Sequence, residues 1–281
     1  MSKEELIEVF EDTKKIYSLE NFSKIIERNV FATHIYDGNI RTDSDYEYAK
    51  PAEIKVTNRD TITAASDYAN SDEINTENGI IGILNFASST TPGGGVTKGS
   101  TAQEECICRC TTLYPALNQK KCWDHYYSIN RKANTNIGSD TIIYTPDVLV
   151  LKDKNYHRIR KDQMFYVDVI TCAAPNLREK PSNLYNAGAS KTPLTLTDEE
   201  LYNIHVQRAK RIFDVARAHD IDYLVLGAFG CGAFKNNPEI VAKAYKDVIP
   251  EYLQYFKVID FAIIDGKNSN NYEVFQRVLL Q

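Results

Sequence analysis

Short, almost continuous apolar runs alternate with amphipathic helical patterns along most of the chain. Runs such as Leu224–Leu226 and Phe261–Ile264 are typical of strands covered on both faces of a sheet. We expect strands at 54–58, 80–86, 142–151, 165–173, 223–229 and 258–265. We expect helices between them at 62–68, 102–113, 118–127, 198–218, 239–249 and 272–279. This order predicts an α/β fold with helices on both faces of a mostly parallel or mixed sheet.

The first 50 residues have a different pattern and predict a helical N-terminal extension. Their apolar residues recur with a period near 3.6, which indicates one helix and then a second: Leu6, Val9, Phe10, Ile16, Tyr17, then Phe22, Ile25 and Ile26. The polar stretch 38–51 predicts a loop that joins the extension to the rest of the chain. We therefore expect an extension at 1–50 and one compact domain at 51–281.

Composition excludes several classes of protein. Of the 281 residues 43% are hydrophobic and 25% charged, as in globular domains and unlike disordered, collagen-like or coiled-coil chains. The net charge of −5 argues against a general duplex-DNA or anionic-membrane binder, because either needs a basic surface. No apolar run has the length of a signal peptide or a membrane span, which predicts a cytoplasmic protein. We expect a monomer.

The cysteines and histidines do not predict a metal site. The six cysteines are too sparse for a disulfide scaffold, and only Cys106 and Cys110 would share a helix face. No Cys-x-x-Cys pair accompanies them, and the five histidines share no motif. Free thiols, structural or surface histidines, and no metal or cofactor are the expectation.

A glycine-rich segment follows the expected strand 80–86 and precedes the next helix. Gly93-Gly94-Gly95 lies beyond the carboxyl end of a strand, where open α/β sheets bind ligands. Glu104 and Glu105 begin the helix and could face the same ligand. The alternatives are a flexible surface turn and two acidic residues that only complement the helix dipole. Lys98 in this segment could meet a phosphate or solvent.

A second glycine-rich segment follows the expected strand 223–229. Gly230 and Gly232 bracket one residue, as in loops whose backbone N–H groups point at an anion. The segment matches neither the Rossmann fingerprint nor the Walker A pattern. Two such loops, one of which carries paired carboxylates, predict a phosphate-containing ligand and acid/base chemistry.

These residues resemble a known family. Gly93-Gly94-Gly95, seven intervening residues and Gln103-Glu104-Glu105 resemble the signature of the poly(ADP-ribose) glycohydrolases, in their bacterial or microbial type. Further similar segments occur in the family's order: 84–88, 111–115, 143–148 and 226–234. The resemblance implies a macrodomain-like three-layer α/β/α sandwich with a mixed sheet, here with its helical N-terminal extension.

The resemblance also implies roles for individual residues. Glu105 acts as acid/base on the ribose–ribose glycosidic bond, while Glu104 holds ribose hydroxyls. The glycines at 93–95 shape the loop over the terminal ribose, and the segment 230–234 wraps the diphosphate. The implied substrate-binding set is Asn85, Gly93, Gly94, Gly95, Val96, Gln103, Gly230, Cys231, Gly232, Ala233 and Phe234.

This chain also departs from the family's pattern. Animal members carry Asp and Asn where it has Asn85 and Ser88, so their ribose contacts do not transfer. None of the 18 tyrosines matches the family's adenine-stacking tyrosine.

The expected activity is hydrolysis of ribose–ribose O-glycosidic bonds in poly(ADP-ribose), with release of ADP-ribose. Glycosidases usually place two carboxylates on opposite sides of the bond, and adjacent glutamates do not give that arrangement. One carboxylate would therefore act alone as acid and base. The alternatives are a hydrolase of mono-ADP-ribosyl adducts on protein or nucleic acid, and a non-catalytic ADP-ribose reader. The presence of both glutamates favours an enzyme, since a reader needs no acid.

Overall fold

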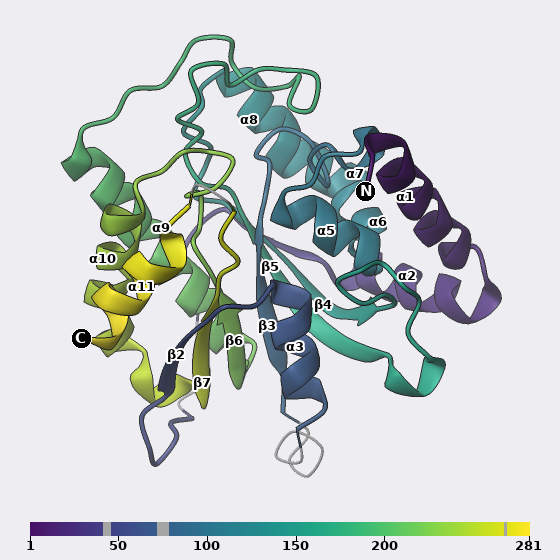
Figure 1. The fold of residues 1–281 in the computed structure, drawn as a ribbon, viewed down its shortest axis with the longest axis horizontal. Helices are drawn as coiled ribbons and strands as arrows, with labels where there is room; N and C mark the ends of the chain where they lie inside the picture. The colour runs from purple at the N-terminus through teal and green to yellow at the C-terminus, as the bar shows by residue number, and fades with distance from the viewer. Residues whose placement is uncertain (42–45, 72–78, 267–268) are drawn as a thin grey trace.

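The computed structural model describes residues 1–41, 46–71, 79–266 and 269–281, and it is built around one seven-stranded mixed sheet (Figure 1). The strand order is β1-β4-β5-β3-β6-β7-β2. Five neighbouring strands, from β5 to β2 in that order, are parallel, while β4 is antiparallel to both β5 and β1. The strands are β1 (His34–Tyr36), β2 (Glu53–Thr57), β3 (Ile81–Phe86), β4 (Ile142–Val150), β5 (Phe165–Cys172), β6 (Tyr223–Leu226) and β7 (Val258–Ala262).

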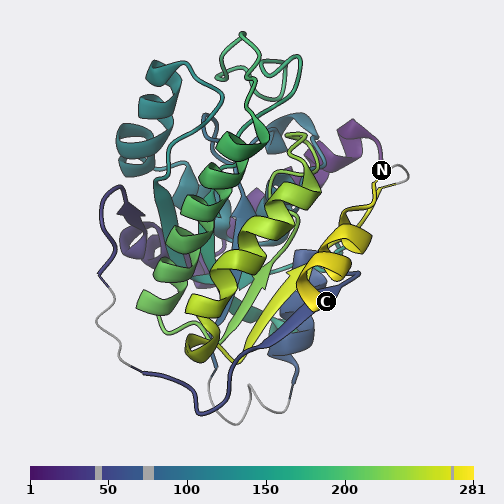
Figure 2. The same cartoon turned by 90° about the vertical axis from the view of Figure 1, so that its left-hand side faces the viewer.

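Helices cover both faces of this sheet and confirm the three-layer α/β/α arrangement. One face carries α9 (Asp198–Ala218), α10 (Pro238–Val248) and α11 (Asn271–Leu280), which lie side by side in Figure 2. The other face carries α3 (Thr61–Ala69), α5 (Gln103–Cys110) and α6 (Leu113–Leu117). Each face has its own cluster of buried apolar side chains, as the continuous apolar runs of the parallel strands require.

The first 41 residues form both expected helices and a strand that the helical prediction missed. The helices are α1 (Lys3–Tyr17) and α2 (Glu20–Ala32). Strand β1 follows and pairs with β4 at the sheet edge, so this part of the chain adds to the sheet itself. Phe10 of α1 is fully buried in the cluster that also contains Ile107 of α5. Of the loop expected at 38–51, residues 42–45 lie outside the described residues.

Two expected helices are divided in the structure. The segment 102–113 breaks at Thr111, which bridges to Val150 of β4 and separates α5 from α6. The segment 118–127 becomes α7 (Lys120–Cys122) and a π-helical turn (Trp123–Tyr127), and α8 (Ser128–Ala133) continues it. Short helices joined by such irregular turns do not keep the 3.6-residue period on which the prediction depended.

The ends of the strands and helices near the glycine-rich segments are well defined. Strand β6 ends at Leu226, three residues earlier than expected, because Gly227 begins a turn in which Phe229 N–H bonds the Gly227 carbonyl at 2.8 Å. Helix α10 begins at Pro238 as its sequence suggests. Among the described residues, no helix is long and apolar enough to span a membrane.

Candidate active site

A cleft of about 440 Å³ opens at the carboxyl ends of β3, β6 and β7. Its lining comes from the loop after β3, the start of α5, the loop after β6, and a long irregular segment between β5 and α9. That segment, residues 173–197, crosses the top of the molecule in Figure 1. Both glycine-rich segments of the sequence therefore meet at one cleft, where ligands bind in open α/β sheets.

The first glycine loop (residues 87–102) is folded around the two glutamates. Gly94 has φ +56°, and a Cβ at this position would lie 2.5 Å from Glu105 Oε1 and 3.0 Å from Glu104 Oε2. A side chain here would strain the left-handed backbone and displace the Glu105 carboxylate, so glycine is favoured. Both carboxylates thus converge on the backbone of Gly94.

Each glutamate is fixed through one carboxylate oxygen and keeps the other unpaired. Glu105 Oε1 accepts the Gly95 N–H at 2.8 Å, and Glu104 Oε2 accepts the Ser88 N–H at 2.7 Å. Glu105 is 6% exposed and Glu104 is 2% exposed. Among the described residues, Glu105 Oε2 and Glu104 Oε1 have no hydrogen-bond partner. Buried carboxylate oxygens without partners are unfavourable in a purely structural role, so they indicate a site prepared for a ligand.

The electrostatics of Glu104 separate it from an ordinary glutamate. Burial and the neighbouring Glu105 raise the pKa of Glu104 well above its usual value, although N–H groups of Ser88 and Gly93 and the Asn85 amide oppose the rise. Loss of solvation disfavours the charged form, and a second carboxylate nearby adds to the effect. Glu104 therefore retains its proton to higher pH than an exposed glutamate.

The second glycine loop (residues 227–237) is more open than the first. Gly230 has φ +79°, and a Cβ there would lie 2.5 Å from Ala174 Cβ. A Cβ on Gly232, by contrast, would have no atom within 4 Å. Within the described part of the chain, four successive or nearly successive backbone N–H groups have no hydrogen-bond partner: those of Gly230, Gly232, Ala233 and Phe234. Free N–H groups in such a turn form an anion-binding concavity.

A buried histidine and asparagine hold this loop from behind. His205 on α9 lies with its Nε2 2.7 Å from Asn236 Oδ1, and Asn236 Nδ2 donates to the Pro175 and Phe234 carbonyls. Burial lowers the pKa of His205 to about 4, so the ring is neutral at physiological pH. The neutral ring then donates its Nε2 proton to Asn236.

Nine of the residues assigned from sequence line the cleft. They are Gly94, Gly95, Gln103, Glu104, Glu105, Gly230, Gly232, Ala233 and Phe234. The Gln103 amide is nevertheless committed to the protein, since it accepts from Phe86 N–H and donates to the Leu84 carbonyl and Thr61 Oγ1. It joins the start of α5 to the end of β3 and so positions the glutamates that follow it.

Four other residues of the expected substrate-binding set lie behind the cleft, not on it. Asn85 is fully buried and donates to Thr171 Oγ1 at 3.2 Å, while its amide also contacts Glu104. Val96 and Cys231 belong to the two hydrophobic clusters. Gly93 packs against the ring of Tyr114. These four residues shape the loops around the ligand site, because the side chains of Asn85, Val96 and Cys231 are buried in the protein and Gly93 has none.

The segment 173–197 supplies cleft residues that no sequence motif indicates. Arg178, Tyr185 and Asn186 all line the cleft. Asn186 Oδ1 accepts from Ser88 Oγ and Thr90 Oγ1, which ties the segment to the first glycine loop. Lys98 donates to the Leu184 carbonyl at 2.6 Å, so it too holds this segment. The segment has no hydrophobic period, and its Asn, Pro and Gly residues alone predict only an irregular loop.

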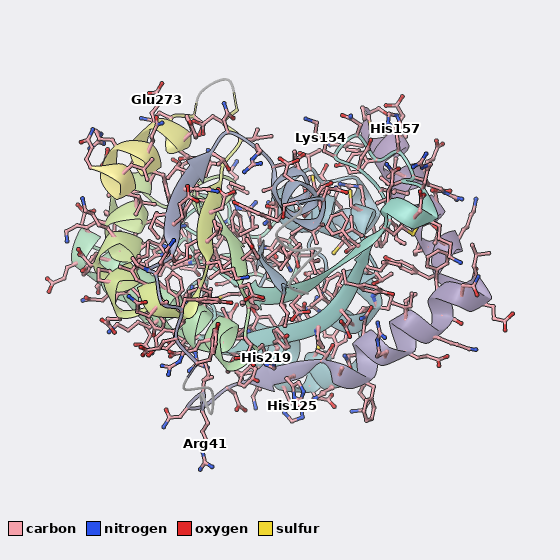
Figure 3. The ribbon with its side chains drawn as sticks, turned by 90° about the horizontal axis from the view of Figure 1, so that it is seen from below. Arg41, His125, Lys154, His157, His219 and Glu273 are labelled. Carbon is pink, nitrogen blue, oxygen red and sulfur yellow. The ribbon has the colours of Figure 1, made fainter. Side chains whose placement is uncertain are left out.

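Two of the histidines lie close together, because the ring centroids of His34 and His219 are 6.3 Å apart. In the view of Figure 3, His157 lies on the other side of the molecule from His125 and His219. In the described ranges no group of three or more His, Cys, Asp or Glu side chains could hold a metal ion. All six cysteines are free thiols, as expected.

The paired glutamates and the glycine loops suggest a family for this chain, and comparison with known families identifies it. The sequence model described as the catalytic domain of microbial-type PARG, or poly(ADP-ribose) glycohydrolase, matches residues 6–153, which is more than half of the chain and includes both glutamates. The chain belongs to the microbial-type PARG family. Among curated proteins, none matches the sequence.

Solved PARG structures share the whole fold. Poly(ADP-ribose) glycohydrolase from Thermomonospora curvata is 25% identical, with 98% of this chain and 99% of that one covered and a TM-score of 0.78. The same enzyme bound to the inhibitor ADP-HPD gives a TM-score of 0.77 at the same identity and coverage. The Deinococcus radiodurans enzyme in complex with ADP-ribose is also 25% identical, covers 91% of this chain and 96% of that one, and has a TM-score of 0.71. The chain thus has the PARG fold along nearly its full length.

Proposed function

We propose that this chain hydrolyses the ribose–ribose O-glycosidic bonds of poly(ADP-ribose) and releases ADP-ribose, with Glu105 as the acid/base. The observation that carries the proposal is the Glu105 carboxylate itself. One oxygen is held by Gly95 N–H at 2.8 Å, and the other is buried at the cleft without a partner among the described residues. Membership of the microbial-type PARG family and the PARG complexes with ADP-ribose and ADP-HPD support the same substrate.

A single carboxylate can carry out both proton transfers. As the bond between the anomeric carbon and the leaving oxygen breaks, Glu105 gives its proton to that oxygen. Water then forms the new bond to the anomeric carbon and returns a proton to Glu105, so the enzyme ends as it began. Because Glu104 approaches the same glycine, it does not occupy the opposite face of the sugar, as the second carboxylate of most glycosidases does.

Glu104 has a different task in this proposal. One of its oxygens accepts the Ser88 N–H, and the other has no hydrogen-bond partner among the described residues. A glutamate with a raised pKa offers both a proton donor and an acceptor, and a ribose hydroxyl can bond with either. Glu104 would therefore hold the ribose so that the glycosidic oxygen meets Glu105.

The second glycine loop would hold the diphosphate of the same ligand. Four free backbone N–H groups can bond phosphate oxygens without any charged side chain. The diphosphate then lies beside the ribose, where its negative charge stabilises the positive charge that develops on the sugar during bond breaking.

The direct test is to incubate the intact chain with poly(ADP-ribose) and, separately, with mono-ADP-ribosylated protein, and to assay free ADP-ribose. Release from the polymer is the expected result. Release only from the mono-ADP-ribosylated protein would identify a hydrolase of mono-ADP-ribosyl adducts instead. Binding of ADP-ribose without release from either substrate would show a reader and would contradict the assignment of Glu105.

A further inference from the structure

Arg178 lines the cleft and has no part in the proton transfers proposed for Glu105. It comes from the irregular segment between β5 and α9, and its guanidinium carbon lies 5.3 Å from the centre of the Phe234 ring. The backbone joins the same two segments, because Leu177 N–H donates to the Phe234 carbonyl at 2.9 Å. Arg178 is therefore fixed against the second glycine loop, whose N–H groups face the cleft.

The guanidinium group is held in place but keeps free donors. Its Nε donates to Asn176 Oδ1 at 3.0 Å, and one Nη2 proton goes to the Pro181 carbonyl at 3.1 Å. Within the described residues, Nη1 has no hydrogen-bond partner, and the side chain is only partly buried. The two hydrogen bonds to its own segment orient the planar guanidinium group and leave its Nη1 donors available to a ligand.

The charged residues that line the cleft are mostly acidic, so a cation among them would favour the binding of an anion. The charged residues that line it are Asp60, Glu104, Glu105 and Arg178, so Arg178 is the one basic residue of the described lining. Burial lowers the pKa of Arg178 and the proximity of Glu105 raises it, which places the guanidinium within electrostatic reach of that carboxylate. A diphosphate that approached the ionised acidic residues of this lining without a cation would be repelled.

We infer that Arg178 is the cation of the diphosphate site: it binds a phosphate oxygen beside the free N–H groups at 230–234. The inference rests on the proposed function, because it takes the diphosphate of ADP-ribose as the ligand. The second glycine loop supplies neutral donors, and Arg178, which lies against this loop, supplies a positive charge. The stacked Phe234 ring keeps the guanidinium aimed at the cleft.

The test measures the dissociation constant of ADP-ribose for the intact chain, its Arg178→Gln variant and its Lys180→Gln variant, from about 50 mM to about 500 mM NaCl. Lys180 is the matched control, since it is exposed on the same segment, does not line the cleft, and loses the same charge. Arg178→Gln should weaken binding by roughly 10-fold or more at low salt, the usual effect of one charge-assisted hydrogen bond. The ratio of its dissociation constant to that of the wild type should shrink as salt rises, and Lys180→Gln should bind like the wild type.

Three results would overturn the inference, and they differ from a failure of the proposed function. A wild-type chain that releases ADP-ribose while Arg178→Gln binds it normally would remove Arg178 from the site and leave the hydrolase intact. A ratio that is independent of salt would show that Arg178 only shapes its loop. If Arg178→Gln does not fold, Arg178→Met replaces it, since it removes the charge and keeps the aliphatic stem: a loss of roughly 10-fold that shrinks as salt rises supports the inference, and normal binding or a loss independent of salt overturns it. A wild-type chain that neither binds nor releases ADP-ribose would instead contradict the proposed function.

Discussion

The two glycine loops lie on the same cleft but use their backbone N–H groups differently. In the first loop the N–H groups of Ser88 and Gly95 bond the carboxylates of Glu104 and Glu105. In the second loop, among the described residues, the N–H groups of Gly230, Gly232, Ala233 and Phe234 bond nothing. The first loop is therefore committed to the protein's own anions, and the second is available to the anions of a ligand. We conclude that the first loop serves the reaction and the second serves binding.

The largest expected effect is the loss of turnover when Glu105, which the first loop holds, is replaced by Gln. Glu105→Gln keeps the shape of the side chain and the bond from Gly95 N–H but cannot transfer a proton. Turnover of poly(ADP-ribose) should fall by roughly 10²–10⁴-fold, while the dissociation constant of ADP-ribose hardly changes. Glu104→Gln, measured beside it, should reduce both turnover and affinity, because that side chain would hold the ribose. Normal turnover in a folded Glu105→Gln protein would reduce Glu105 to a partner of the helix dipole.

Gly94→Ala tests whether the backbone of the first loop places the glutamates. The added Cβ would lie 2.5 Å from Glu105 Oε1 on a residue with φ +56°. A displacement of about 1 Å at a catalytic group lowers rates by roughly 10²-fold, and the left-handed backbone adds about 1–2 kcal/mol of strain. Steady-state kinetics and the melting temperature measure the two effects. Gly232→Ala is the matched control, since its Cβ meets no atom within 4 Å, and it should keep nearly normal rate and stability.

Acid should loosen the second loop through His205. The pKa of this buried histidine is about 4, below the usual 6.5, so the unfolded chain binds the proton more readily than the folded chain. The stabilisation is complete above pH 6.5 and decreases as the pH falls towards 4, by about 3 kcal/mol in total. Chemical denaturation across this range would measure the loss for the wild type and for His205→Gln, whose amide can still donate to Asn236.

The wild type and His205→Gln are compared by the stability that each loses in acid. Their difference separates the contribution of His205 from that of other groups such as His219, whose pKa burial also lowers to about 4. His205→Gln should lose less stability in acid than the wild type. Equal losses in the two proteins would assign the acid sensitivity elsewhere.

Gly232→Val gives the smallest effect and tests the openness of the second loop. The branched side chain would project from an exposed position where the phosphate approaches, without a clash inside the protein. Binding of ADP-ribose should weaken by about 10-fold, as when one or two hydrogen bonds to a charged group are lost. Thermal shift against ADP-ribose concentration measures this change, because a ligand stabilises in proportion to its affinity. An unchanged affinity would exclude this part of the loop from the site.

The two loops also differ in how far their roles could be predicted from sequence. Both follow buried strands, and the glycine positions with the adjacent glutamates were sufficient to place them at one site. The fold class and most element bounds follow from hydrophobic period, and helix α9 was predicted to the residue. Strand β1 was missed because it has only three residues, which are too few to show the alternating pattern of a strand.

The cleft's remaining residues could not be predicted, for a physical reason. Arg178, Tyr185 and Asn186 come from a segment without regular secondary structure, and only tertiary contacts bring them to the cleft. Conversely, Asn85, Val96 and Cys231 lie next to cleft residues in sequence but point into the core, because alternate residues of a strand or turn face opposite sides. A motif identifies the loop, and the packing decides which of its side chains reach the ligand.

The division of work between the loops is tested most directly by the double variant Glu105→Gln/Gly232→Val, measured with both single variants. For each protein, turnover of poly(ADP-ribose) at saturating substrate and the dissociation constant of ADP-ribose are determined. If the first loop serves the reaction and the second serves binding, the double variant has the turnover of Glu105→Gln and the dissociation constant of Gly232→Val. Two results would contradict this division between the loops. One is a Gly232→Val protein whose turnover at saturating substrate falls as far as that of Glu105→Gln. The other is a Glu105→Gln protein that binds ADP-ribose as weakly as Gly232→Val.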